Sequence, residues 1–370
     1  INMMNNIKDT VKKIHYSHDL TPMENMLKLF LMLMSIPYTI AVTLRYLMYE
    51  TGIKKAHSVP EYVISVGNLT TGGSGKTPLT AEIAKTLQIK GFRTAILSRG
   101  YGGTLSQKNT NVIADGEKIY YNAQEAGDEP YWLAKNTYGS RIITGKNRYK
   151  SALFAEKNLG VDVFILDDGY QHLPLHRNLD ILVIDYVNKF GNNQVLPAGP
   201  LREPLSEIRR ADKIVVVNKK PHDEQEVKDC RAYARYLAEK YDKQVFVCNM
   251  KPLGIFNLMN GDPLPYNSKI FAFSGIGQPQ SFFDNIENSG YNLIKTKTFD
   301  DHYLYQEYDF MKILADSKEC GADAIVTTEK DAVKIQQFLY AIDDEIPFYV
   351  LKLGVDIEMD VLLEEMNGYV

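Results

Sequence analysis

Residues 72–77 have the composition of a phosphate-binding loop. They read Gly-Gly-Ser-Gly-Lys-Thr and stand between a β-branched run, residues 62–66, and a helical pattern, residues 77–90. Glycines let a loop turn its backbone N–H groups toward phosphate oxygens, and the start of the next helix adds the positive end of its dipole. In such loops the lysine, here Lys76, reaches the β- and γ-phosphates, and the following hydroxyl, here of Thr77, binds Mg²⁺. The expected nucleotide-binding residues are Thr70, Gly72, Gly73, Ser74, Gly75, Lys76 and Thr77.

Two adjacent carboxylates, Asp167 and Asp168, follow an apolar run and precede Gly169. An acidic residue that ends a buried strand commonly holds Mg²⁺ beside the threonine of the loop. Neighbouring side chains in a strand point to opposite faces, so both carboxylates can serve one ion only where the strand ends, and Gly169 indicates such an end. The expected metal ligands are Thr77, Asp167 and Asp168, with no choice made between the two carboxylates. The alternative is a turn with two solvated aspartates.

Further short motifs accompany the loop along the chain. They are residues 67–70 (Gly-Asn-Leu-Thr), 98–102 (Ser-Arg-Gly-Tyr-Gly), 127–130 (Gly-Asp-Glu-Pro), 167–172 (Asp-Asp-Gly-Tyr-Gln-His), 196–204 (Leu-Pro-Ala-Gly-Pro-Leu-Arg-Glu-Pro) and 328–331 (Thr-Glu-Lys-Asp). Together, and in this order, they resemble the tetraacyldisaccharide 4'-kinase family from about residue 25 to near the C-terminus. Thr70 stands where the usual phosphate loop has glycine, and this departure belongs to the family pattern. The polar residues before position 20 are the main difference from that pattern.

The resemblance implies a phosphotransferase with an alcohol group as acceptor. ATP would be the donor and Mg²⁺ the metal cofactor. The acceptor would be the 4'-hydroxyl of an acylated glucosamine disaccharide 1-phosphate, a lipid-linked intermediate of lipid A and lipopolysaccharide biosynthesis. The number and length of its acyl chains stay open.

The resemblance also implies that Asp128 is the catalytic carboxylate and that His302, from the C-terminal part of the chain, is its partner. A sugar hydroxyl is a weak nucleophile, and a carboxylate within hydrogen-bond reach can take its proton as the new P–O bond forms. The histidine would orient that carboxylate, and the two parts of the chain would have to close for turnover. On sequence alone, Asp128 resembles a helix N-cap and His302 an exposed loop residue.

Six residues are expected on the substrate side of the site. A guanidinium can clamp a phosphate with two hydrogen bonds, which favours Arg148 and Arg202 as ligands of the acceptor phosphate. Ordinary surface ion pairing is the alternative for both. His172 would assist the metal or phosphate, or would cap its turn. By the resemblance, the substrate-side residues are Tyr101, Arg148, Gln171, His172, Arg202 and Glu203.

Residues 26–49 form an apolar segment, and within it Lys28 and Arg45 bracket an uncharged stretch. The uncharged stretch of about 16 residues would reach about 24 Å as a helix, short of a hydrocarbon core of roughly 30 Å. Pro37 lies near its middle and is expected to break or kink a single helix. The pattern favours a helix that lies in the membrane interface, and a spanning helix or a buried core helix are the alternatives. The expected location is the cytoplasmic face of the bacterial inner membrane, peripheral or monotopic.

The remaining chain alternates apolar runs with helical stretches, as in an α/β protein. The runs at residues 62–66, 93–97, 163–166, 181–184 and 214–217 are continuous, which is typical of strands buried on both faces of a parallel sheet. The predicted fold class is a P-loop NTPase-type parallel sheet flanked by helices, with a second, smaller α/β domain. The expected divisions are a polar tail (1–24), of which residues 1–20 are expected to be poorly ordered, the apolar helix (25–50), a kinase domain (51–220) and the smaller domain (221–370), hinged near residue 220.

Composition limits the remaining classes. The net charge of −4 does not favour a nucleic-acid binder, and the three cysteines, Cys230, Cys248 and Cys320, have neither zinc-ligand nor disulfide spacing. No obligate protein partner is evident, and the oligomeric state stays open. Other functions are a membrane-recruited ATPase switch, against which Thr71 stands in place of a lysine, and a nucleotide-binding structural module. A GTPase would need an acidic residue two places after Lys219, where the chain has Pro221.

Overall fold

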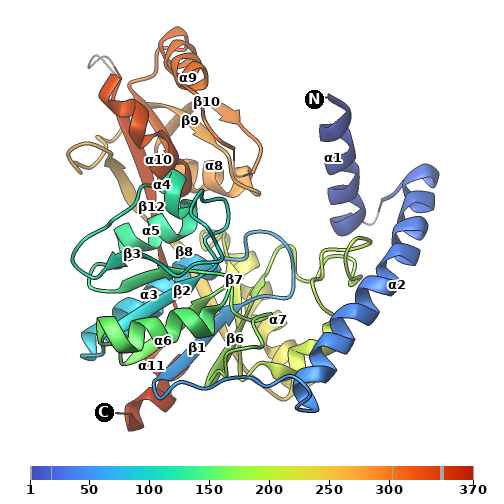
Figure 1. Ribbon diagram of the computed structural model, residues 1–370. Coiled ribbons are helices and arrows are strands. Elements are labelled where there is room, and N and C mark those ends of the chain that lie inside the picture. The colour runs from blue at the N-terminus through green and yellow to red at the C-terminus, as the bar shows by residue number, and fades with distance from the viewer. Residues whose placement is uncertain (1, 18, 302, 342–345, 370) are drawn as a thin grey trace.

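The computed structural model describes residues 2–17, 19–301, 303–341 and 346–369. Within these residues twelve strands form one sheet, and its carboxyl edge carries the loops of interest (Figure 1). The strands are β1 (Tyr62–Gly67), β2 (Thr94–Ser98), β3 (Asn111–Asp115), β4 (Arg141–Thr144), β5 (Val163–Asp167), β6 (Leu179–Asp185), β7 (Lys213–Asn218), β8 (Gln244–Asn257), β9 (Lys269–Ser274), β10 (Asn292–Thr298), β11 (Ala324–Thr328) and β12 (Phe348–Asp356).

The strand order is β10-β9-β11-β12-β8-β7-β6-β1-β5-β2-β4-β3. Neighbours pair in parallel except β3 with β4 and β8 with β12. The central strands β1, β5 and β6 are buried along their whole length, which explains why their sequences are continuous apolar runs. The chain order reverses beside β1, and open α/β sheets bind ligands at such a point, beyond the carboxyl ends of the strands.

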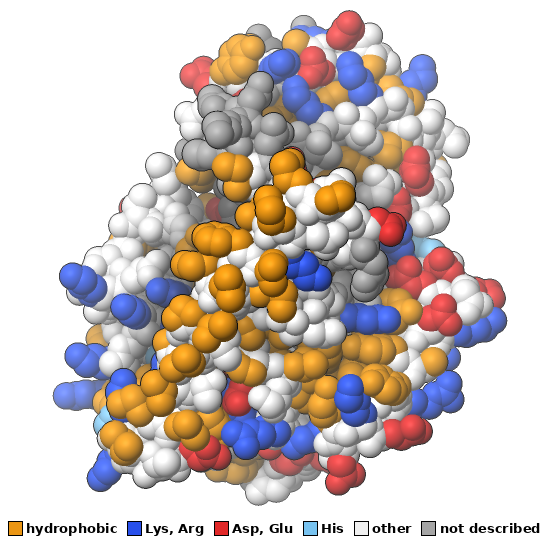
Figure 2. Space-filling model, turned by 90° about the vertical axis from the view of Figure 1, so that its right-hand side faces the viewer, with side chains coloured by type: hydrophobic (Ala, Val, Ile, Leu, Met, Phe, Trp, Pro, Cys, Tyr) orange, Lys and Arg blue, Asp and Glu red, His pale blue; other side chains and the backbone are white. Residues whose placement is uncertain are grey.

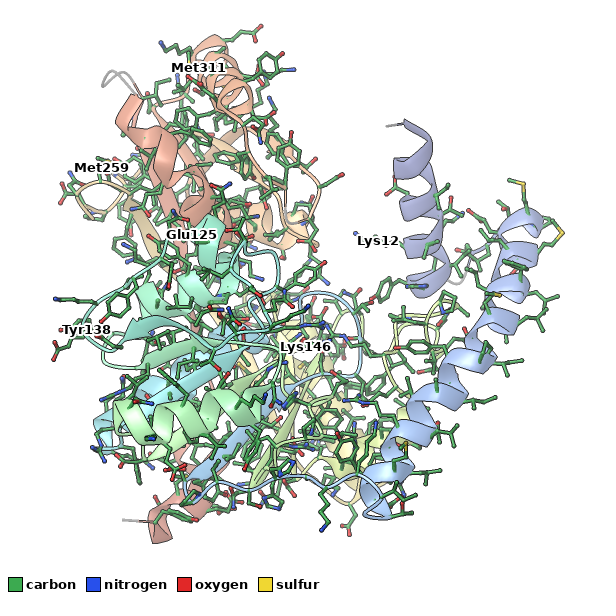
Figure 3. All side chains as sticks on the ribbon, in the orientation of Figure 1. Lys12, Glu125, Tyr138, Lys146, Met259 and Met311 are labelled. Carbon is green, nitrogen blue, oxygen red and sulfur yellow. The ribbon has the colours of Figure 1, made fainter. Side chains whose placement is uncertain are left out.

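Helices cover both faces of the sheet, and side chains fill the space between the layers (Figure 3). Residues of α3, α5 and the C-terminal α11 pack on one face, while α6 and α7 pack on the other. The helices beyond α2 are α3 (Lys76–Ile89), α4 (Ala123–Ala126), α5 (Asp128–Asn136), α6 (Arg148–Leu159), α7 (Glu224–Tyr241), α8 (Pro279–Asn288), α9 (Glu307–Glu319), α10 (Glu329–Ile335) and α11 (Met359–Leu362), with short 3-10 helices at Leu205–Arg210, Gln336–Ala341 and Glu364–Gly368.

A smaller α/β part is built on β9–β12. Phe282 and Phe283 of α8 pack on one face of these strands, and Phe310 of α9 packs on the other. The predicted fold class is therefore confirmed: a mainly parallel sheet between helices, a smaller α/β part and an apolar N-terminal helix. The division at residue 220 stays a prediction. The helix that follows it, α7, packs in the same cluster as Leu182 and Ile214 of the first part.

The C-terminal segment returns to the first part of the molecule. Leu362 and Met366 are buried in the cluster that contains α3. The side chain of Lys213, at the start of β7, is 3% exposed, and its Nζ lies 3.4 Å from Glu364 Oε1 and 2.8 Å from Glu365 Oε1. These contacts join the last helices to the central sheet.

The apolar segment forms one helix, α2 (Pro22–Glu50), which Pro37 does not end. The expected break is therefore wrong: Pro37 removes one backbone donor, and the helix continues on both sides of it. Within the described residues α2 is the helix long and apolar enough to cross a membrane by length and composition. Its apolar side chains are not buried, which rules out a core helix. Figure 2 shows them as a band of hydrophobic side chains along this face of the molecule, and they include Met26, Leu29, Phe30, Leu33, Ile36, Ile40 and Leu44.

A further helix, α1 (Asn2–Tyr16), precedes α2 and lies beside it (Figure 1). The expectation of a poorly ordered tail is wrong for these residues. Thr21 caps α2 with its side chain and Glu24 returns a bond to it, a capping box that fixes the turn between the two helices. Lys13 Nζ of α1 then lies 2.8 Å from Glu24 Oε2.

Candidate functional site

The phosphate loop joins the carboxyl end of β1 to the start of α3. Gly72 and Gly75 have positive φ angles, of 104° and 86°, and a residue with a side chain would be strained at either position. A Cβ on Gly72 or Gly73 would meet no heavy atom within 4 Å, so open space borders the loop. Lys76 and Thr77 occupy the first turn of α3, where backbone N–H groups lack helical partners. The loop therefore has the shape and the polarity of an anion cradle.

The residues before the loop support it from the inside. Asn68 is 1% exposed, and its Nδ2 donates to Ser74 Oγ at 3.1 Å and to Thr70 Oγ1 at 3.3 Å. The N–H of Thr71 donates to Pro200 O at 2.8 Å. Thr70, which replaces the usual glycine, thus uses its hydroxyl in the support of the loop.

The two aspartates lie on the same side of the sheet edge. β5 ends at Asp167, and Asp168 has a φ of 56°, so the chain turns sharply after the strand. Asp167 is 2% exposed, and its Oδ1 accepts from Thr80 Oγ1 at 3.2 Å. Asp168 Oδ1 lies 3.6 Å from Lys76 Nζ. Since both partners belong to α3, the turn brings both carboxylates toward the nucleotide loop.

The two carboxylates differ in electrostatics. Burial, with the charges of Glu129 and Asp168, raises the pKa of Asp167 to about 7. Burial also acts to raise the pKa of Asp168, but the charges of Lys76 and Arg202 outweigh it and hold that pKa at about 2. Asp168 is therefore the permanent anion of the pair.

These residues fit a magnesium ion bound together with phosphate. Within the described ranges no three His, Cys, Asp or Glu side chains form a metal-binding group. Mg²⁺ at phosphate sites commonly takes one or two carboxylates and completes its shell with water and phosphate oxygens. Asp168 Oδ1 is buried without a hydrogen-bond donor, and the hydroxyl of Thr77 is close to the loop. Both oxygens fit this type of coordination.

Gln171 and Arg202 connect this centre to α2. Arg202 Nη1 donates to Asp168 Oδ2 at 2.7 Å and to Gln171 Oε1 at 3.4 Å. Gln171 Nε2 donates to Asn68 O at 2.9 Å. The carbonyl of Gln171 accepts from Arg45 Nη2 at 2.9 Å, so the apolar helix bonds directly to the segment that carries the aspartates.

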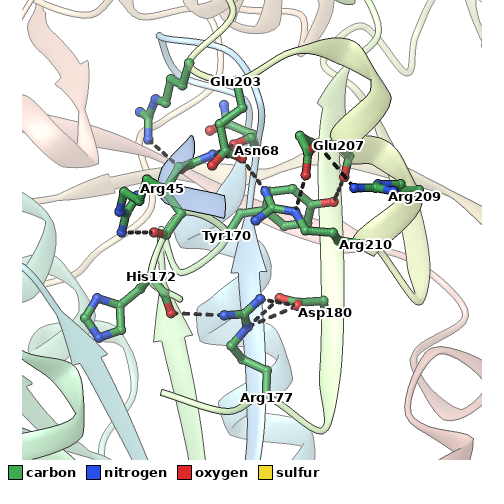
Figure 4. Close-up of polar contacts among 12 residues, drawn as sticks. Arg45, Asn68, Tyr170, His172, Arg177, Asp180, Glu203, Glu207, Arg209 and Arg210 are labelled. Atoms are coloured by element: carbon green, nitrogen blue, oxygen red, sulfur yellow. Dashed lines mark hydrogen bonds and ion pairs between the residues drawn. The ribbon is translucent and has the colours of Figure 1, made fainter. Parts of the chain in front are cut away.

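Glu203 lies in a buried ionic group behind the site (Figure 4). It is 2% exposed and pairs with Arg210, which also pairs with Glu207 at 3.2 Å. Burial raises the pKa of Glu203, and the Arg210 charge opposes that rise. The guanidinium of Arg210 stacks on the ring of Tyr170, whose hydroxyl donates to Glu207 O at 2.6 Å. The group fixes Tyr170, between the aspartates and Gln171.

Arg148 and His172 are buried beside the aspartates and keep unused polar atoms. Arg148 is 6% exposed, and its Nε has no hydrogen-bond acceptor. Burial lowers the pKa of Arg148 to about 10, although the Asp168 charge acts to raise it. Burial and the Arg148 charge lower the pKa of His172 to about 3, so its imidazole is neutral. A cation this deeply buried favours an anionic ligand.

The loop that carries Tyr101 packs against the start of α5. A Cβ on Gly127 would lie 2.6 Å from Tyr101 O, and one on Gly103 would lie 2.5 Å from Glu125 O. Only glycine allows these two segments to approach so closely. Tyr101 itself is 71% exposed beside Asp128, the first residue of α5. The motifs at residues 98–102 and 127–130 thus form one corner of the site.

Asp128 contacts the smaller α/β part. Lys334 Nζ of α10 lies 3.3 Å from Asp128 Oδ2 and 3.5 Å from Asp331 Oδ1. Asp331 is fully buried and accepts from Gly275 N and Thr328 Oγ1, both at 2.8 Å. The motif at residues 328–331 therefore builds the support on which Lys334 meets Asp128. His302 lies outside the described residues.

Two further lysines, neither of which was predicted as a site residue, cross between the parts. Lys330 Nζ donates to Glu129 Oε1 at 2.6 Å. Lys219 Nζ donates to Gly73 O of the phosphate loop at 2.6 Å and to Gln278 Oε1 at 2.8 Å. The only sequence signal for Lys219 is its place at the end of a strand, in the dipeptide that suggested a GTPase.

Comparisons with known proteins agree with the motifs. A family model described as Tetraacyldisaccharide-1-P 4'-kinase matches residues 27–368. The tetraacyldisaccharide 4'-kinase of Geobacter metallireducens is 41% identical and covers 82% of this chain and 88% of that protein. That of Halothermothrix orenii is 37% identical and covers 90% of each chain. The crystal structure of LpxK from Aquifex aeolicus in complex with ATP has a TM-score of 0.72 at 32% identity, covering 93% of this chain and 99% of that one.

The similarity to these relatives extends over most of the chain. The family model covers most of the chain, and relatives well above 30% identity cover more than two thirds of it. The resemblance drawn from the motifs is thereby confirmed. The chain belongs to the tetraacyldisaccharide-1-P 4'-kinase family.

Proposed function

We infer that this chain is an ATP-dependent kinase that phosphorylates the 4'-hydroxyl of an acylated glucosamine disaccharide 1-phosphate in lipid A biosynthesis. Its membership of the family supports this function. The observation that carries it is the junction between the aspartate pair and the start of α5. Burial, and then the charge of Glu129 next to Asp128, raises the pKa of Asp167, so the start of α5 lies within electrostatic reach of the aspartate pair. Asp128 is the first residue of α5, so its carboxylate would lie close enough to the nucleotide centre to activate a hydroxyl.

The nucleotide would lie along the phosphate loop. The loop N–H groups and Lys76 would hold the β- and γ-phosphates, and Thr77 with Asp168 would hold Mg²⁺, which supplies charge neutralisation during phosphoryl transfer. We assign Asp168 as the ligand to the metal because it is the permanent anion with an unused buried oxygen. Asp167, bonded to Thr80, would act through water or through the orientation of the turn.

The acceptor hydroxyl would be activated by Asp128. The carboxylate takes the hydroxyl proton as the sugar oxygen attacks the γ-phosphorus in line, and the bond from that phosphorus to the bridging oxygen of ADP breaks. Lys334 would hold Asp128 in a fixed position. His302 is proposed, from the resemblance alone, to support the same carboxylate.

Arg148 is proposed to bind an acceptor or nucleotide phosphate, because its buried guanidinium has an unused donor. Arg202, which bonds to Asp168, would be shared between the metal centre and the substrate. Tyr101 is exposed at the corner beside Asp128 and would contact the sugar. Gln171, His172 and Glu203 would act by holding these groups in place.

The apolar face of α2 is proposed to lie in the cytoplasmic surface of the bacterial inner membrane. Its exposed leucines, isoleucines and methionines would bury in the acyl region, and Lys28 and Arg45 would stay near the headgroups. Because α2 bonds to the segment beside the aspartates through Arg45, the lipid acceptor would reach the site from the membrane surface.

The deciding experiment measures transfer of labelled γ-phosphate from ATP to a purified acylated disaccharide 1-phosphate in detergent. The expected result is labelled lipid with the parent and at least about 100-fold less with Asp128→Asn, since general bases contribute roughly 10²–10⁴-fold. No labelled lipid, together with nucleotide hydrolysis stimulated by vesicles, would contradict the kinase function and favour a membrane-recruited ATPase switch.

A further inference from the structure

The last turn of α1 is fastened to the loop after β6. Ile14 is fully buried, and its carbonyl accepts from Asn192 Nδ2 at 3.0 Å. The carbonyl of His15 accepts from Asn192 N at 2.8 Å, and His15 Nε2 donates to Pro197 O at 3.0 Å. A Cβ on Gly191 would lie 2.6 Å from His15 O, so the loop is shaped to receive the helix end. This turn is a docked part of the fold.

From this anchor α1 reaches two places that matter for the nucleotide site. The hydroxyl of Tyr16 donates to Thr71 O, at the entrance of the phosphate loop, at 3.3 Å. Lys12 Nζ donates to Gly277 O, just before α8, at 3.2 Å. Figure 3 shows Lys12 extending from α1 toward the smaller α/β part. One turn of helix thus bonds to both sides of the site.

The hydrogen bond from Tyr16 to Thr71 O supplies a donor that a phosphate loop requires. When loop N–H groups point to the phosphates, the carbonyls point away and need donors of their own. Gly73 O has Lys219 as its donor, and Thr71 O has Tyr16. Lys219 also binds Gln278, the neighbour of Gly277. Lys219 therefore ties the loop directly to Gln278, and Tyr16 ties it to α1, whose Lys12 bonds to Gly277.

We propose that α1 is a positioning element of the nucleotide site: Tyr16 holds the phosphate loop in its binding shape, and Lys12 sets the distance from that loop to the smaller α/β part. The helix precedes the residues that the family model matches. The inference rests on the proposed function only in requiring that the loop binds a nucleotide.

The first test uses Tyr16→Phe in the full chain. This variant keeps the ring and removes the donor to Thr71 O. Calorimetric binding of a non-hydrolysable ATP analogue with Mg²⁺ is expected to weaken roughly threefold to tenfold, the usual effect of one lost hydrogen bond. The melting temperature and the KM for the lipid acceptor should not change. A purely structural role would lower the melting temperature and leave the KM for ATP and the KM for the lipid acceptor in their original ratio.

The second test compares two neighbouring lysines of α1. Lys12→Met removes the bond to Gly277, while Lys13→Met removes the same charge from the same turn and loses only the bond to Glu24. Weaker analogue binding is expected for Lys12→Met alone. Equal weakening in both variants would reveal a general charge effect and overturn the proposal.

The proposal is also overturned if Tyr16→Phe and Lys12→Met both bind the analogue like the parent. The outcome for α1 can be distinguished from the outcome for the kinase function, because binding of the ATP analogue requires no phosphoryl transfer. If the parent labels no lipid while Tyr16→Phe still weakens analogue binding, the acceptor assignment fails and the role of α1 stands.

Discussion

Lys334 Nζ lies 3.3 Å from Asp128 Oδ2 and 3.5 Å from Asp331 Oδ1, so one ammonium group joins the first residue of α5 to the buried carboxylate of α10. The lysine side chain is 6% exposed and that of Asp331 is completely buried. A cation that lies between these two carboxylates holds Asp128 in position against the smaller α/β part.

Replacement of Lys334 by Met should therefore lower both activity and stability. Removing one partner of a buried ion pair leaves an uncompensated charge, which costs about 3 kcal/mol of unfolding free energy. We expect kcat to fall more than ATP affinity, because the nucleotide loop is untouched. Kinetics and urea unfolding measure the two effects.

Lys330→Met is the matched control. It removes a lysine of the same helix, but one that pairs with Glu129 in place of Asp128. A loss of kcat as large as that in Lys334→Met would show that the contact between α5 and α10, and not the Asp128 pair, matters.

Stability should depend on pH through His172. Its pKa is lowered from 6.5 to about 3, mainly by burial and then by Arg148, Arg177 and Arg45. Below pH 6.5 the unfolded chain takes up a proton that the folded chain refuses, so the unfolding free energy falls as pH falls. Between pH 7.5 and pH 5 this one group should remove about 2 kcal/mol.

Urea unfolding of the parent and of His172→Gln at both pH values measures the effect. Raised pKa values of buried carboxylates such as Glu203 act in the opposite direction, but they are common to both proteins and cancel in the comparison. Identical pH dependence in parent and variant would contradict the assignment of a buried, neutral imidazole.

Membrane binding should depend on the exposed face of α2. Leu33, Ile36 and Ile40 are each more than half exposed, and each would gain roughly 1.5–3 kcal/mol if buried in lipid. Replacing all three by Asp should abolish flotation with vesicles while leaving the melting temperature in buffer unchanged. The control places Asp at Ile89, Met259 and Met311, which are also more than half exposed but lie elsewhere, and it should float like the parent.

Arg45 should link the membrane helix to catalysis. Its bond to Gln171 O holds the segment that carries Asp168, so Arg45→Met is expected to reduce kcat about tenfold, within the range of one charged hydrogen bond. Vesicle flotation should persist. Lys28→Met removes the same charge about 25 Å further along α2 and should leave kcat unchanged. A parallel loss of flotation and activity in Arg45→Met would contradict a direct link.

The central strands and the nucleotide loop were predictable because they are encoded locally. β1, β5, β6 and β7 are buried on both faces and therefore read as continuous apolar runs. β3 is a short edge strand with mixed burial, and its neighbour β4 has only four residues, so no pattern marked either of them. β8 begins with a short apolar run at residues 245–247, but its second part mixes polar and apolar residues and contains Pro252 and Gly254, so no pattern marks its full length.

The residues of the candidate site could be predicted only where a short sequence motif identifies their chemistry. Lys76, Thr77 and the aspartate pair form such motifs, and Asp128 followed from the family resemblance. Lys334 and Tyr16 have no local signal, because each acts on a residue that is distant along the chain. Proximity of this kind arises from the folded topology, which no short pattern contains.

The length of β8 decides how the two parts can move. Its residues 244–249 pair with β7, and its residues 249–257 pair with β12, so one strand belongs to both parts. The pairing shifts register between Lys352 and Leu353, opposite Pro252, which has no N–H to donate. The two parts are therefore connected by a continuous β-strand and not by a flexible linker. A change in the angle between the parts must therefore bend this shared strand, and the irregular pairing opposite Pro252 is where its ladder is weakest.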